Sequence, residues 1–179
     1  MTCPLQKHKK IEGVSTIKIF RNNLVAIIIH IAMCFACLFP INYLWWGVVW
    51  TDSWFDGEIE LRMIAINFLV IGIYTAIVSF LYFLASCKLL CNRHNAMTNL
   101  FSVSAILIVL TVIVFAPYES IINLFLRIPY LPLGETISYF LHIQGKYAAL
   151  IVAPLPSLIM WIGLSCKNRP QRLQKPNSG

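Results

Sequence analysis

Four long apolar stretches constrain this chain more than any other feature of its sequence. They cover about residues 24–43, 63–86, 97–116 and 147–165, and none of them contains Asp, Glu, Lys or Arg. A helix needs about 20 apolar residues to cross roughly 30 Å of hydrocarbon. Because lipid offers no partner to a free backbone N–H or C=O group, each stretch is predicted to form a membrane-spanning α-helix.

The composition of the whole chain supports an integral membrane protein. Hydrophobic residues make up 59% of the 179 residues, charged residues make up 12%, and the mean hydropathy is +0.75. Soluble domains contain about 45–50% apolar and about 25% charged residues, and a domain of this size has too little interior to bury the excess. An ordinary soluble enzyme, a disordered chain and a secreted disulfide scaffold are therefore excluded. We expect one all-α membrane domain over residues 1–179, with polar tails at 1–22 and 167–179.

The distribution of charge predicts how the chain is oriented. Eleven of the 14 Lys and Arg residues lie before the first stretch, between the second and the third, or after the fourth, whereas six of the 7 Asp and Glu residues lie in the other two loops. Loops rich in Lys and Arg stay in the cytoplasm. The sequence thus predicts a four-helix bundle in the plasma membrane with both termini cytoplasmic. The net charge of +7 suits anionic lipid headgroups, whereas its division among three short segments is not typical of nucleic-acid binding.

The two loops predicted to lie outside have different characters. Four tryptophans follow the first stretch, where indole rings prefer the headgroup layer, and they are predicted to be interface anchors, with a ligand cage as the alternative. These residues are Trp45, Trp46, Trp50 and Trp54. The second outer loop, from Pro117 to about Lys146, contains apolar residues such as Leu124 and Phe125. It is predicted to form an amphipathic or re-entrant cap, or alternatively a surface for a protein partner.

Two prolines interrupt the fourth stretch near the middle of the bilayer. Pro154 and Pro156 each lack a backbone donor, so the carbonyls of Leu150 and Val152 are predicted to lose their helical partners. Lipid cannot satisfy these carbonyls, and broken helices at this depth bind substrates in many transporters. A ligand or ion site at the break, with Ser157 nearby, is one interpretation, and a simple kink is the other.

His30 and Asn67 are the most polar side chains deep in the stretches. Polar groups inside a membrane face the bundle interior and can line a path. A rise of 1.5 Å per residue places the two side chains roughly 10 Å apart along the membrane normal, which is too far for a direct hydrogen bond. Two separate interhelical hydrogen bonds are the favoured interpretation, and an ion path shared with the proline break is the alternative.

The cysteines offer two further hypotheses. Cys34 and Cys37 form a C-x-x-C pattern, which is typical of thiol-redox chemistry, but burial in lipid would weaken both nucleophiles, and small-residue helix packing is the simpler interpretation.

A tetrahedral zinc site is a weak possibility at the inner ends of the second and fourth stretches. Its ligands would be Cys87, Cys91, His94 and Cys166. The spacing matches no standard zinc motif, and we expect neither a metal nor any other cofactor.

No catalytic constellation or phosphate-binding loop is present in the sequence, so an enzyme is not the favoured interpretation. The leading hypothesis is a non-enzymatic accessory, interaction or immunity-type protein that lies in the lipid bilayer, with a membrane-protein partner or a second copy of itself. The first alternative is a small transporter or channel protomer with its site at the Pro154/Pro156 break. The second alternative is a thiol-redox membrane enzyme that uses Cys34 and Cys37.

Overall fold

The computed structural model of the protein describes residues 4–44, 61–91, 96–115 and 121–166. All regular structure in these ranges is helical, as the sequence predicts. The elements are α1 (Pro4–Leu44), α2 (Leu61–Leu89), α3 (Ala96–Phe101), α4 (Ser104–Val114), α5 (Ile121–Arg127), the 3-10 helix η3 (Ile128–Tyr130), α6 (Leu131–Leu141), α7 (Gly145–Val152) and α8 (Leu155–Cys166).

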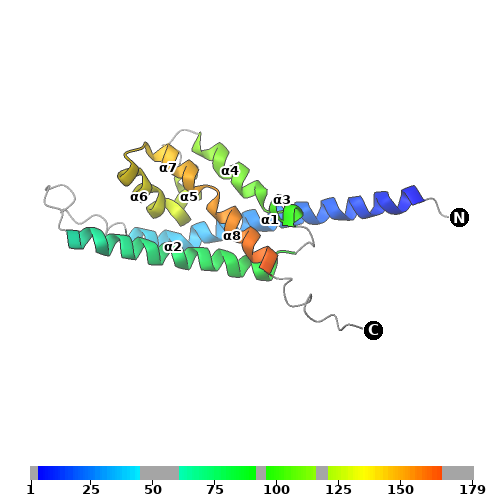
Figure 1. Ribbon diagram of the computed structural model, residues 1–179, viewed down its shortest axis with the longest axis horizontal. Coiled ribbons are helices and arrows are strands. Elements are labelled where there is room, and N and C mark those ends of the chain that lie inside the picture. Colours follow the sequence, from blue (N-terminus) through cyan, green and yellow to red (C-terminus); the bar gives the residue numbers. More distant parts are fainter. Residues whose placement is uncertain (1–3, 45–60, 92–95, 116–120, 167–179) are drawn as a thin grey trace, which may run out of the picture.

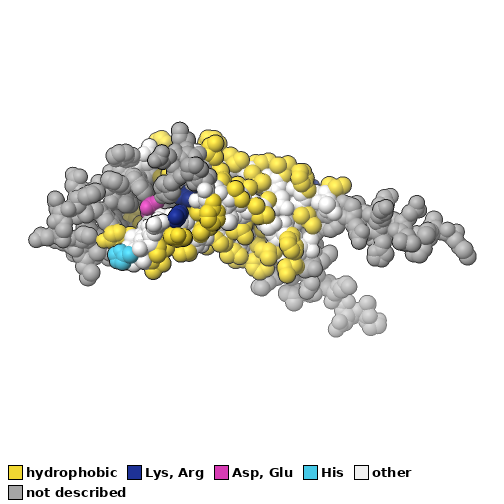
Figure 2. Space-filling view, turned by 90° about the horizontal axis from the view of Figure 1, so that it is seen from above, with side chains coloured by type: hydrophobic (Ala, Val, Ile, Leu, Met, Phe, Trp, Pro, Cys, Tyr) yellow, Lys and Arg dark blue, Asp and Glu magenta, His cyan; other side chains and the backbone are white. Residues whose placement is uncertain are grey.

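Three helical segments are long and apolar enough to cross a membrane. They are Thr16–Asn42 in α1, Phe68–Leu89 in α2, and Gly145–Cys166, which comprises α7 and α8. These segments correspond to the first, second and fourth predicted stretches. Figure 2 shows a broad apolar surface across the middle of the molecule, and Phe39 on α1 is 85% exposed. Exposed apolar surface of this extent suits contact with lipid.

The first helix is longer at its amino end than expected. The sequence predicts a polar tail over residues 1–22, but α1 begins at Pro4 and continues without interruption into the apolar segment. The predicted interface anchors Trp45, Trp46, Trp50 and Trp54, and the carboxyl-terminal tail, lie outside the described residues.

The third predicted stretch differs from the expectation of one continuous helix. It is divided into α3 and α4, and α4 has only 11 residues, fewer than the roughly 20 that a straight crossing needs. The division lies at Val103, whose φ of −128° and ψ of 5° are not helical. Serines flank it on both sides, and the Ser102 and Ser104 hydroxyls donate to the carbonyls of Thr98 and Phe101. Such local side-chain bonds compete with a continuous helix.

The predicted interruption of the fourth stretch is present. Helix α7 ends at Val152 and α8 begins at Leu155. The backbone N–H of Ala153 donates to Ala149 across 2.9 Å, and the next helix starts with Leu158 donating to the carbonyl of Pro154, also at 2.9 Å. The prolines thus separate two short helices that follow one another along the same side of the molecule (Figure 1).

The long helices run lengthwise through the molecule (Figure 1). Helix α2 returns antiparallel to α1, and α4 then runs in the direction of α1. Helices α7 and α8 run back in the direction of α2, so that α1 begins and α8 ends towards the same end of the molecule. The short elements α5, α6 and α7 gather at the opposite end.

Helix α8 packs tightly against α2. A Cβ atom added at Gly163 would approach the backbone carbonyl of Phe83 to 2.8 Å and would also collide with the hydroxyl of Ser86. The Cys87 thiol donates to the carbonyl of Gly163 across 3.2 Å. Close approach through a small residue, together with a hydrogen bond, is typical of helix packing in membranes.

Candidate functional site

His30 joins three separate parts of the fold. It lies near the middle of the apolar segment of α1, and its side chain is only 4% exposed. Its Nε2 lies 3.0 Å from the carbonyl oxygen of Leu126 on α5, and its Nδ1 lies 2.6 Å from the hydroxyl of Tyr82 on α2. A carbonyl oxygen can only accept, so Nε2 carries a proton and, in the neutral ring, Nδ1 accepts from Tyr82.

The polar cluster continues from Tyr82 to η3. The rings of Tyr82 and Tyr130 are stacked with their centroids 5.9 Å apart. The hydroxyl of Tyr130 lies 3.5 Å from the hydroxyl of Ser79, a residue near the middle of the apolar segment of α2. A tyrosine hydroxyl is protonated at neutral pH, so Tyr130 can donate a hydrogen bond.

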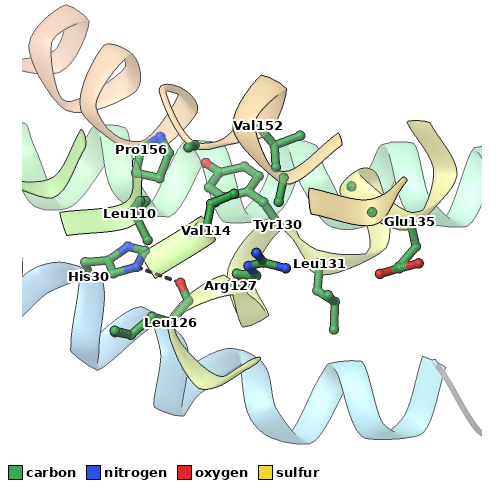
Figure 3. Close-up of a pocket in the computed structure, with 14 residues that line it drawn as sticks. His30, Leu110, Val114, Leu126, Arg127, Tyr130, Leu131, Glu135, Val152 and Pro156 are labelled. Atoms are coloured by element: carbon green, nitrogen blue, oxygen red, sulfur yellow. Dashed lines mark hydrogen bonds between the residues drawn. The ribbon is translucent and has the colours of Figure 1, made fainter. Parts of the chain in front are cut away.

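A pocket lies beside this cluster, between α1, α4, α5, α6 and the α7–α8 break (Figure 3). Four of its lining residues carry polar or ionisable side chains: His30, Arg127, Tyr130 and Glu135. Most of the remaining wall is apolar, and it includes Leu110, Val114, Leu126, Leu131, Ala149, Val152, Ala153 and Pro156. The volume open to the centres of water-sized spheres is about 30 Å³. A single water needs about 10–15 Å³, so the pocket has room for water or for a small group.

Two residues of opposite charge border the pocket. Arg127 is the last residue of α5 and directly follows Leu126, whose carbonyl bonds His30. Its Nε and Nη2 atoms are buried, and Figure 3 shows its guanidinium below Tyr130, near the middle of the pocket. Glu135 lies towards the α6 end of the same pocket. Most of the charged side chains visible in Figure 2 gather over this α5–α7 region.

A hydrogen bond links the α3–α4 break to the first turn of α8. The Ser157 hydroxyl on α8 donates to the carbonyl of Val103 across 3.1 Å. Ser157 is 3% exposed and Val103 is completely buried. The break between α3 and α4 is thus held against the first turn of α8, next to the break that borders the pocket.

Two asparagines of α1 bind the backbone of other elements. The Asn23 amide donates to the carbonyl of Phe101 at 3.0 Å and accepts from the N–H of Ala105 at 3.1 Å. Asn22 makes a similar pair of bonds with the carbonyl and N–H of Cys91, at 2.8 and 3.1 Å. Asn23 therefore satisfies backbone groups on both sides of the α3–α4 break.

The structure brings three of the predicted path residues to one pocket. His30, Val152 and Pro156 all line it. Ser157 is adjacent but binds Val103 instead. Leu150 and Pro154 belong to the same break and are not among the residues that line the pocket. The side chain of Asn67 lies outside the described residues, so its predicted role stays a prediction.

Cys34 and Cys37 lie on the buried face of α1. They are 0% and 4% exposed, and each is a free thiol. A thiol-redox enzyme must bring its reactive sulfur to a substrate thiol, and neither position offers such access.

The predicted zinc ligands do not converge in the described part of the chain. Cys87 donates to Gly163, the sulfur of Cys91 contacts the Arg21 guanidinium, and Cys166 is exposed at the end of α8. His94 lies outside the described residues. In the segments that the structure describes, no three residues among His, Cys, Asp and Glu are grouped to hold a metal ion.

Sequence reasoning missed several residues of the site. Arg127 and Glu135 were counted only as loop charges, although Arg127 directly follows the apolar run Ile121–Leu126. Tyr82 was not singled out, because a tyrosine in an apolar stretch gives no signal of its hydrogen bond. Asn23 lies between the predicted polar tail at residues 1–22 and the first stretch, and it was not singled out.

No known protein family matches this chain, and neither a curated protein nor a solved structure is significantly similar to it.

Proposed function

We propose that this protein is a small carrier or channel protomer of the cell membrane, and that it binds a small solute in the pocket beside His30. One observation carries the proposal. Residues near the middle of three different apolar segments meet at the same place: His30 and Pro156 line the pocket, and Ser79 contacts the pocket residue Tyr130. Convergence of this kind at the middle depth of a bilayer is where transporters place their substrate sites.

The proposed topology has four crossings with both termini in the cytoplasm. Helices α3 and α4 together form the third crossing in chain order, which the alternating helix directions in Figure 1 support. The basic residues then flank the inner ends of the crossings, in agreement with the rule that Lys and Arg remain inside. Asn23 and Ser157 satisfy backbone groups at the break, as lipid cannot.

The segment α5–η3–α6 forms a re-entrant cap in this proposal. Its Leu126 carbonyl contacts His30, and its Tyr130 hydroxyl contacts Ser79. Both contacts lie near the middle of the long apolar segments, so the cap extends beyond the outer membrane face into the bundle. This position would bring Arg127 to the same depth. An ionisable side chain inside a membrane is costly, and it marks a functional site by default.

The hypotheses of an accessory or interaction protein and of a thiol-redox enzyme gain less support from the described residues. Exposed apolar side chains are distributed over all the α-helices from α1 to α8, a distribution that suits contact with lipid and does not single out one surface for a partner. A redox role is disfavoured by the burial of Cys34 and Cys37.

Reconstitution into vesicles with a pocket variant tests the proposal. Gly134 lines the pocket, and a Cβ there would sit 3.7 Å from Val152, an ordinary contact distance, so Gly134→Ala fills space without a clash. Gly72→Ala is the matched control, because a Cβ at Gly72 meets nothing within 4 Å. The probes are alkali cations, chloride, phosphate, acetate and small amino acids.

We expect at least one probe to cross faster than in protein-free vesicles. Gly134→Ala should slow that flux while Gly72→Ala leaves it unchanged. A wild-type protein that passes none of the probes, or two glycine variants with the same flux, would contradict the proposed function.

A further inference from the structure

We propose that His30 is the binding site of a proton that crosses the membrane together with the solute of the pocket. This inference rests on the proposed function and deepens it by naming the ion to which transport is coupled. Three features carry it: the place of the ring at the pocket, the chemistry of its two hydrogen-bond partners, and the space beside it.

His30 is the group at the pocket that responds to pH near neutrality. A histidine ordinarily changes its charge between about pH 5 and 8, whereas guanidinium, phenol and carboxyl groups ordinarily titrate outside this range. The pocket lining includes one of each: Arg127, Tyr130 and Glu135. The lining residues from α4, α7 and α8 carry no titratable side chain.

The remaining titratable neighbours of His30 belong to the two long helices. Tyr82 on α2 bonds the ring, and Cys34 lies one turn further along α1. A phenol and a thiol ordinarily lose their protons only above neutral pH. Arg127 and Glu135 have interactions of their own within the protein, so neither is required to bind the proton. A change of charge near pH 7 at this pocket is therefore a change at His30.

Both hydrogen-bond partners of His30 suit the ring with or without the extra proton. In the neutral ring, Nδ1 accepts from the Tyr82 hydroxyl and Nε2 donates to the Leu126 carbonyl. An imidazolium donates from both nitrogens, and a hydroxyl oxygen accepts as well as donates. Tyr82 can thus turn its hydrogen away and accept from Nδ1 across the same 2.6 Å. The protonated ring keeps two acceptors, as a buried cation requires.

The pocket gives the ring access to water. His30 lines it, and Figure 3 shows the ring beside Leu110 at the pocket's α1 side. The volume of about 30 Å³ is more than one water needs. A hydrated proton can therefore reach the ring. The Nδ1–H bond forms as an O–H bond of the hydrated proton breaks, which leaves neutral water, and release is the reverse step.

A proton on His30 changes the charge beside the solute by one unit. Charges act strongly on one another in a poorly solvated site, so the protonated and neutral forms of the pocket bind a solute with different affinity. By linkage, the solute changes the affinity of the ring for the proton by the same factor. A conformational change that opens the pocket to one side of the membrane then loads or releases both together.

Nitrogen NMR on the full-length protein in lipid nanodiscs tests proton binding directly. With isotope-labelled histidine, a protein in which His8, His94 and His142 are replaced by glutamine leaves His30 as the single labelled ring. We expect the ring to carry a proton on Nε2 alone at about pH 8 and on both nitrogens at about pH 5. A ring that stays neutral throughout this range would overturn the proposal.

Flux in vesicles tests whether the proton moves with the solute. The probes of the glycine experiment are measured at equal pH and with an alkaline interior; acetate is left out, because acetic acid crosses lipid unaided. We expect the pH gradient to change the net flux of the transported probe at least about fivefold. His30→Gln should abolish this response, since glutamine can still donate to the Leu126 carbonyl but binds no proton.

His142→Asn is the matched control for His30→Gln. His142 is exposed at the end of α6, and asparagine tolerates its positive φ of 50°. This variant should keep the full response to the pH gradient. If His30→Gln does not fold, the NMR titration still decides whether the ring binds a proton, and the wild-type flux still decides whether transport is coupled to it.

The possible failures can be told apart. A probe that crosses equally fast with and without the pH gradient would overturn the coupled proton and would leave the carrier or channel intact. A gradient response that His30→Gln retains would place the proton on another group and would overturn the inference as well. Absence of flux for every probe, with or without the gradient, would instead contradict the proposed function itself.

Discussion

The two helix breaks of this protein differ in what surrounds them. At the α3–α4 break, side chains from other helices form hydrogen bonds with the backbone: Asn23 binds Phe101 and Ala105, and Ser157 binds Val103. At the α7–α8 break, Ala153 and Pro156 instead border a pocket that also contains ionisable groups. We call the α3–α4 break sealed, because side chains bind its backbone, and the α7–α8 break open, because it borders a pocket. An interrupted helix in a membrane is thus a candidate site only where the chain leaves space beside it.

The largest expected effect lies outside both breaks, at the close packing of α8 on α2. Gly163→Ala should lower the free energy of unfolding by about 2–3 kcal/mol, because its Cβ would be forced against the Phe83 carbonyl, which cannot move without its helix. Unfolding by SDS in mixed micelles measures the change, with Gly72→Ala as the control. Equal stabilities of the two variants would show that this contact is looser than the structure indicates.

The next effect concerns the seal of the α3–α4 break itself. Asn23→Leu should cost about 2 kcal/mol of stability, because it leaves the Ala105 N–H without its partner and removes one of the two hydrogen bonds to the Phe101 carbonyl, the other coming from Ser104. Hydrogen exchange should also rise at Ala105 in the variant. Asn42→Leu, at an exposed position of the same helix, serves as the control. If Asn23→Leu is as stable as the wild type, water or another group forms hydrogen bonds with the backbone at this break.

A smaller loss is expected from the bond that links the two breaks. Ser157→Ala should cost about 1 kcal/mol, the usual value for one hydrogen bond between membrane helices. Ser165→Ala is its control, because the buried Ser165 hydroxyl bonds none of the described residues. A Ser165→Ala loss as large as that of Ser157→Ala would mean that the measurement reports packing rather than the bond to Val103.

The smallest change in stability is expected at the open break. Gly134→Ala should leave the stability unchanged or raise it by up to about 1 kcal/mol, since alanine is the better helix former and the new methyl group meets Val152 at an ordinary distance. The same variant should nevertheless reduce binding of the solute. Thermal unfolding and probe binding on one preparation measure both. A stability loss comparable to that of Gly163→Ala would show that the α6–α7 region is as closely packed as the α2–α8 contact. The α7–α8 break would then not be open.

The sequence predicted the parts of the fold that depend on local composition. The all-helical architecture and three apolar segments follow from hydrophobic length alone, and the α7–α8 break follows from Pro154 and Pro156. The α3–α4 break could not be predicted in this way. No proline or glycine marks it, and Ser102 and Ser104 are tolerated in many continuous membrane helices.

The site depended on contacts that local sequence does not record. His30 was recognised as a buried polar group, but its partner Leu126 lies 96 residues away along the chain. Charge counting placed Arg127 in an outer loop, because such counting treats every residue between two apolar stretches alike. Only the packing of α5 against α1 brings its guanidinium to the pocket.

The double hydrogen bond of His30 has a mechanical consequence. An imidazole is a flat, rigid ring, so its two nitrogens cannot be aimed independently. A shift of Leu126 that swings Nε2 also turns the Nδ1 lone pair away from Tyr82. Movement of α5, the short helix that ends in Arg127, is therefore transmitted through the His30 side chain to Tyr82 on α2.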